Sequence, residues 1–177
     1  MQYAIGIWSE IRDFKGGPSP QSHMSAERAG LYAIHLLVAG LWAGSIVFVT
    51  GVVLPAARDG DLNAAPLSSM TGKLKLISRA GSLLLLLTGL RMAMLGGYTN
   101  TDTLLGSTQG YLVVAMVVLW VVMTGLIEVG GSKITDGTSQ KKVREPARTA
   151  RPFLLGASLC SVVLLAIGGV LSSGAAL

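Results

Sequence analysis

The sequence predicts an all-α integral membrane protein, a bundle of four transmembrane helices. Of its 177 residues, 51% are hydrophobic and only 13% are charged, and the mean hydropathy is +0.60. The apolar residues lie in four long blocks, and most charged residues lie in the short stretches between them. Soluble domains rarely gather apolar residues into such runs, so we expect a lipid bilayer around most of the chain.

The four blocks are each close to the roughly 20 residues that a helix needs to cross the hydrocarbon of a bilayer. We expect the spans at about 30–54, 76–97, 110–129 and 152–172, within one membrane domain over residues 30–175. None of the blocks carries an amphipathic stripe. Helices are expected because a helix satisfies its own backbone hydrogen bonds in lipid, whereas an open strand does not.

Residues 1–29 precede the first span and form a different kind of segment. Apolar residues recur there at steps of three and four, at Ala4, Ile7, Trp8, Ile11 and Phe14. Charged residues occupy the other face, and glycines and prolines follow from Gly16 to Pro20. The pattern favours an interfacial amphipathic helix, and a disordered leader is the alternative.

The connecting segments predict the orientation in the membrane. Basic residues flank the first and third connections: Arg58, Lys73, Lys75, Arg79, Lys133, Lys141, Lys142, Arg144, Arg148 and Arg151. The second connection has neither Lys nor Arg, and Tyr32, Tyr98 and Tyr111 mark its side of the bilayer. The positive-inside rule and the aromatic belt therefore place both basic loops in the cytoplasm and both termini outside, in the cell membrane.

The net charge of +5 is explained by these flanking residues. They face the lipid bilayer and are not interleaved with exposed aromatic residues, so we expect no nucleic acid partner. The single cysteine, Cys160, excludes an intramolecular disulfide and a cysteine-rich metal site. The chain has no phosphate-binding loop of the GxxxxGK type, which argues against coupling to ATP.

Four residues with polar or soft side chains are expected at one depth, about 8 to 9 Å below the outer boundary. They are His35 in the first span, Arg91 and Met92 in the second, and Met116 in the third. Met94 lies slightly nearer the surface. Steps of three or four return to one helix face, so Met92 and Met94 point in different directions and only one need face the bundle.

Imidazole nitrogen and methionine sulfur together indicate a metal site. Both bind Cu(I) well without the deprotonation that a thiol requires. We therefore identify His35, Met92, Met94 and Met116 as candidate copper ligands. The alternatives are that the methionines only fill gaps in packing and that His35 hydrogen-bonds across helices.

Two arginines in the second span have different expected roles. Arg91 either faces the bundle, where it would hold an anion or fix a polar group, or extends outward to the headgroups. Arg79 begins the span and Glu128 ends the third, so an ion pair with a structural role is geometrically available between these antiparallel neighbours.

Helix one also carries candidate packing residues. Trp42 follows His35 by seven residues, lies on the same face and is expected to pack inward beneath the imidazole. Gly40 and Gly44 form a small-xxx-small pair, which lets helix backbones approach closely within the chain or in a dimer.

The segments Ile34–Leu37 and Leu41–Gly44, followed by Ser78, Arg79 and Leu83–Leu90, resemble the CopD family of copper resistance and copper export membrane proteins. The similarity spans roughly residues 32–128. Its signatures are H-x6-W-x-G in one helix and S-R…L-T-G in the next, and the matching residues are His35, Trp42, Gly44, Ser78, Arg79, Thr88 and Gly89. The resemblance implies copper transport or resistance. We expect Trp42, Thr88 and Arg91 to support the ligands.

Two other functions stay open. The chain is also similar to the four-helix protoporphyrinogen oxidases, which have a histidine in helix one and bind haem. The only other histidine, His23, lies outside the spans, so haem b would need His35 with a methionine. The third reading is a non-catalytic subunit, in a homo-oligomer or a larger membrane complex. A transporter or subunit is favoured over an enzyme.

Overall fold

The computed structural model describes residues 20–173, which contain no strand. The first span combines α2 (Pro20–Phe48), the π-helix η1 (Val49–Val53) and α3 (Leu54–Asp59), which follow one another directly. The others are α4 (Ala64–Leu95), α6 (Thr108–Ser139) and α7 (Arg144–Ser172), and the short α5 (Thr101–Leu105) precedes α6. Four helices are long and apolar enough to cross a membrane, which confirms the predicted all-α membrane bundle.

The helices extend beyond the apolar blocks that predicted them. The first begins at Pro20 rather than near position 30, and the third continues past position 129 to Ser139. Polar residues beyond the apolar blocks still form helix until a residue adopts a left-handed backbone, as Gly60 does after α3 and Lys141 after α6. The interfacial helix predicted for residues 1–14 lies outside the described residues.

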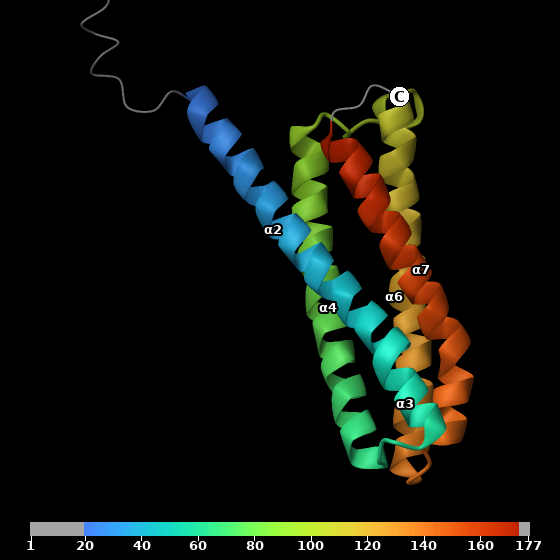
Figure 1. Cartoon of the computed structure of the whole chain (residues 1–177). Coiled ribbons are helices and arrows are strands. Elements are labelled where there is room, and N and C mark those ends of the chain that lie inside the picture. The colour runs from blue at the N-terminus through green and yellow to red at the C-terminus, as the bar shows by residue number, and fades with distance from the viewer. Residues whose placement is uncertain (1–19, 174–177) are drawn as a thin grey trace, which may run out of the picture.

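Successive long helices run in opposite directions and form a ring (Figure 1). α2 packs against α4 and α7, α4 packs against α6, and α6 has its largest contact with α7. We call the end with the 60–63 and 140–143 connections the basic end, and the end with Tyr32, Tyr98 and Tyr111 the tyrosine end. α2 leans away from the bundle towards the tyrosine end (Figure 1).

The π-helix lies one turn before Pro55 in the first span. The N–H of Leu54 donates to the carbonyl of Val49, five residues back instead of four. Pro55 has no N–H to donate, so the regular ladder cannot continue through this turn, and a wider turn is a common adjustment. Within it, the buried hydroxyl of Thr50 donates to the carbonyl of Leu154 on α7 at 3.3 Å and joins the two helices.

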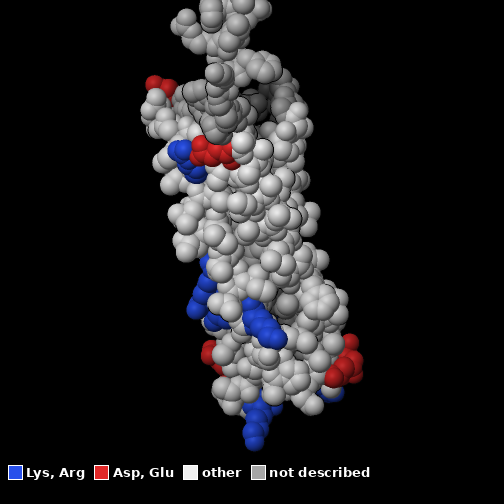
Figure 2. Space-filling model, turned by 90° about the vertical axis from the view of Figure 1, so that its left-hand side faces the viewer, with Lys and Arg blue, Asp and Glu red and all other residues white. Residues whose placement is uncertain are grey.

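The tightly packed core occupies the basic-end half of the bundle. Ile46, Leu67, Ile127, Ile134, Leu154 and Ala157 are among its fully buried residues. Small residues bring α6 and α7 together there: a Cβ on Gly130 would lie 3.1 Å from Leu154, and one on Gly137 would overlap Pro146. The charged side chains on the visible face lie towards the two ends, with an uncharged band between them (Figure 2).

Candidate functional site

A cavity of about 360 Å³ lies between the helices in the tyrosine-end half. All four long helices contribute to its wall, which is mostly apolar. The side chains that carry polar or sulfur atoms are Tyr32, His35, Trp42, Met92, Tyr98, Gln109, Met116, Trp120, Met123 and Ser161. The cavity extends from Trp42 and Met123 near mid-bundle to Tyr98 and Gln109 at the tyrosine end, where the Tyr98 hydroxyl donates to Gln109 at 2.8 Å.

His35 is held on the cavity wall by α4. Its Nδ1 lies 2.7 Å from the Thr88 hydroxyl oxygen. A glycine follows Thr88, and the imidazole Cε1 would lie 3.4 Å from a Cβ at Gly89. Thr88 therefore supplies a hydrogen-bonding group for the imidazole, and the missing side chain of Gly89 leaves room for the ring.

The Thr88 hydroxyl oxygen has two close partners. It lies 2.7 Å from His35 Nδ1 and 2.7 Å from the carbonyl oxygen of Leu84. Its single hydrogen can be donated to either of them, and when it is donated to Leu84 the threonine oxygen accepts from Nδ1–H. In that tautomer the lone pair of Nε2 is available, and no described group forms a hydrogen bond with that nitrogen.

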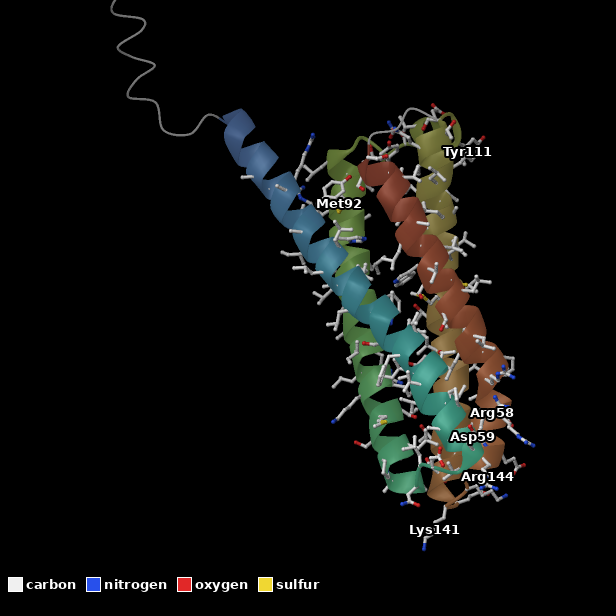
Figure 3. The ribbon with its side chains drawn as sticks, viewed as in Figure 1. Arg58, Asp59, Met92, Tyr111, Lys141 and Arg144 are labelled. Carbon is white, nitrogen blue, oxygen red and sulfur yellow. The ribbon has the colours of Figure 1, made fainter. Side chains whose placement is uncertain are left out.

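The structure separates the candidate methionines. Met92 and Met116 line the same cavity as His35. Met94 does not, and it is 50% exposed on the surface. Figure 3 labels Met92 on the tyrosine-end half of α4. A site built from His35 thus has two of the three predicted thioethers in its cavity.

The two cavity tryptophans differ in their hydrogen bonding. Trp42 is 2% exposed, as expected for a residue packed beneath His35, and its Nε1 donates to the buried hydroxyl of Ser78 at 3.0 Å. Trp120 Nε1 is buried and has no hydrogen-bond partner among the described residues. Trp42 therefore fastens α2 to α4, whereas the Trp120 indole contributes only its ring to the wall.

Arg91 faces away from the cavity. Its guanidinium forms an ion pair with Glu27 on α2 at 2.6 Å, and half of the side chain is exposed. Next to it, Arg28 donates to the carbonyl of Leu95 at 2.9 Å, near the end of α4. Arg91 therefore points away from the cavity and joins α4 to α2 through Glu27, and its contact with lipid headgroups stays a prediction.

The ion pair predicted between Arg79 and Glu128 is present at the basic end. Two guanidinium nitrogens reach the two carboxylate oxygens, at 2.8 and 3.1 Å. Lys75 adds a contact of 3.5 Å to the same carboxylate and lies 3.4 Å from the Ser132 hydroxyl. These contacts join α4 to α6, far from the cavity.

Gly40 and Gly44 do not mediate helix packing among the described residues. Both are exposed on α2, and a Cβ built on either meets no atom within 4 Å. Gly81 on α4 is the glycine at the α2 contact, where its Cβ position lies 3.6 Å from the Trp42 ring. A contact of the Gly40 and Gly44 face with another chain stays a prediction.

Within the described residues, no three His, Cys, Asp or Glu side chains gather as a metal-binding group. In the cavity, the side-chain donors that suit a soft metal ion are the His35 imidazole and the thioethers of Met92, Met116 and Met123. No protein-family model, curated protein or solved structure matches the chain. The function is therefore argued from the cavity and its residues.

Two residues of this region were not singled out from the sequence. Glu27 is the partner of Arg91, and Met123 lies at the deep side of the cavity. Glu27 could have been found from the sequence. It lies about two turns before His35, which places its carboxylate at the same height in the bundle as Arg91 near the end of α4. Nothing in the apolar third block distinguishes the direction of Met123 from that of its neighbours.

Proposed function

We propose that the chain is a copper-handling membrane protein of the CopD type, acting in copper transport or resistance with its basic end in the cytoplasm. Cu(I) would bind transiently in the cavity as the transported ion. The observation that carries this proposal is the available Nε2 of His35 in a cavity that Met92 and Met116 also line.

The chemistry of these three groups suits Cu(I). A neutral imidazole and two thioethers are borderline to soft ligands, and none must lose a proton in an apolar setting. Thr88 orients the ring from the far side, as a hydrogen-bond acceptor behind a metal-binding histidine usually does. A site with so few ligands binds weakly enough to release its ion, as passage through a membrane requires.

The signature residues that resemble the CopD family also support the proposal through their contacts. His35 from the first signature hydrogen-bonds with Thr88 from the second, and Trp42 from the first hydrogen-bonds with Ser78 from the second. Gly89 lies against the imidazole. Two short patterns that are separate in the sequence thus form one connected unit on one wall of the cavity.

Copper binding to the purified full-length chain tests the proposal. Cu(I) affinity is measured in detergent under reducing conditions by competition with a chromophoric chelator. We expect His35→Ala to lower it by more than tenfold, and Met92→Leu and Met116→Leu to lower it by about tenfold each. His23→Ala and Met94→Leu are the matched controls and should bind as the unmodified chain does. Equal binding by His35→Ala and His23→Ala would overturn the proposal.

Thr88→Val tests whether the tautomer of His35 matters. Valine keeps the shape of threonine but removes the acceptor for Nδ1–H, so we expect Cu(I) affinity to fall by about tenfold while the helical content stays unchanged. Thr88→Ser keeps the hydroxyl and should restore most of the affinity. An unchanged affinity in Thr88→Val would exclude the positioning role.

Haem binding is a second candidate, favoured by the size of the cavity. A volume of about 360 Å³ is far larger than one metal ion needs, and the wall is mostly apolar. Haem would use His35 and a methionine as axial ligands. A Soret band in the purified chain that His35→Ala abolishes would support haem in place of copper. If the purified chain binds neither copper nor haem, the remaining interpretation is a non-catalytic subunit.

A further inference from the structure

Four arginines from two helices gather at the basic end, away from the cavity. Arg58 belongs to α3, and Arg144, Arg148 and Arg151 belong to α7. We call this set the arginine edge. The three residues on α7 follow one another at steps of four and three, so they lie on one face of the helix.

A bond between α7 and the end of α3 places that face beside Arg58. Arg144 donates from Nη2 to the carbonyl of Asp59 at 3.1 Å. Its guanidinium lies directly against Gly60, whose φ of +92° and missing Cβ allow the approach. Figure 3 labels Arg58, Asp59 and Arg144 together where α3 and α7 meet.

The positive charge of the arginine edge is not neutralised by ion pairs. None of its four guanidinium groups forms an ion pair with an acidic side chain among the described residues. Asp59 follows Arg58 in the sequence but forms no ion pair with it. Glu145 follows Arg144 but pairs with Lys142 at 3.7 Å. Arg58 Nε is buried without a partner. By contrast, Glu128 forms ion pairs with Arg79 and Lys75 at the same end of the molecule.

An apolar surface continues from the arginines along the same flank of α7. Leu155, Leu159 and Val162 follow Arg151 at steps of four, four and three, and all three are exposed. A ligand that fits this surface needs a negatively charged head and a long apolar tail. Guanidinium groups bind phosphate oxygens in a forked geometry, so a phosphate headgroup is the matching anion.

We propose that the arginine edge binds the phosphate headgroup of an anionic phospholipid, whose acyl chain lies along Leu155, Leu159 and Val162. The site is independent of the copper proposal because it shares no residue with the cavity. It differs from general attraction to an anionic membrane in requiring these arginines and not the other basic residues of the same end.

Lipid binding by the full-length chain tests the proposal. The chain is purified in mild detergent, and bound lipid is counted by native mass spectrometry with added phosphatidylglycerol or phosphatidylcholine. We expect a preference for phosphatidylglycerol, and we expect Arg148→Gln with Arg151→Gln to reduce its apparent affinity by about tenfold. Inorganic phosphate at millimolar concentration should not displace the lipid, because it lacks the tail.

Lys73→Gln with Lys141→Gln is the matched control. It removes the same charge at the same end, from exposed residues without ion pairs among the described residues. We expect it to keep phosphatidylglycerol binding within about twofold. Equal losses in the two double variants, no preference for phosphatidylglycerol, or displacement by phosphate would each overturn the proposal. Circular dichroism confirms that both variants keep their helices.

Discussion

The two halves of the bundle are built from the same apolar residue types but are packed differently. In the basic-end half, glycines and alanines of α6 and α7 meet aliphatic side chains, and Ile127, Ile134 and Leu154 are fully buried. In the tyrosine-end half, α2 leans away and a partly open cavity of about 360 Å³ lies between the helices. Close contact in the membrane depends on small residues and van der Waals packing, so one half can hold the bundle together while the other stays open to a ligand.

Polar contacts join helices in both halves. The basic-end half has the Arg79–Glu128 pair and the bond from Thr50 to the α7 backbone, and the tyrosine-end half has the Arg91–Glu27 pair and the bond between His35 and Thr88. On the cavity wall, two ring nitrogens, His35 Nε2 and Trp120 Nε1, have no hydrogen-bond partner among the described residues. A packed region tolerates few such groups, whereas a ligand site needs them.

Paired leucine truncations test the difference most strongly. Leu154 is fully buried in the basic-end half, and Leu164 lines the cavity. We expect Leu154→Ala to lower the free energy of unfolding by about 2–5 kcal/mol, because it removes contacts on every side of a packed side chain. Leu164→Ala should cost about 1 kcal/mol or less, because one side of that leucine already lacks partner atoms. Unfolding in mixed micelles measures both, and equal losses would contradict the comparison.

A glycine pair tests how closely the basic-end helices approach each other. A Cβ at Gly137 would overlap the Pro146 ring, so we expect Gly137→Ala to cost about 1–3 kcal/mol. Gly44→Ala is the control, since its Cβ would meet no atom within 4 Å and alanine favours helix. It should leave stability unchanged or raise it slightly. A loss in Gly44→Ala alone would instead indicate that this exposed face is in contact with another chain.

The smallest expected effect concerns the ion pair near the tyrosine end. Glu27→Gln removes the partner of Arg91 and should lower stability by roughly 0.2–1 kcal/mol, because both side chains are partly exposed. Since the pair joins α2 to α4 beside the open half, we expect faster hydrogen exchange near Arg28 and Leu95 and unchanged exchange near Trp42. Uniform changes along α2 would show that the halves are not independent.

Much of the fold could be predicted because hydropathy depends on contiguous residues. The four spans and their order followed from block length, and the Arg79–Glu128 pair followed from the 1.5 Å rise of antiparallel helices. The structure places the predicted site residues in different surroundings. His35, Met92 and Met116 do share a cavity, but Met94 is exposed and Arg91 turns towards Glu27.

The sequence by itself thus determined that four helices are long and apolar enough to cross a membrane, and at what height along its helix each polar residue lies. The tertiary structure decided how each helix is rotated about its axis, and therefore which methionine faces the cavity and that Gly40 and Gly44 face outward. The physical reason is that these helices are apolar on all sides. With no polar face to direct them, their rotation depends on contacts between residues far apart in the chain, such as Trp42 with Ser78 and His35 with Thr88.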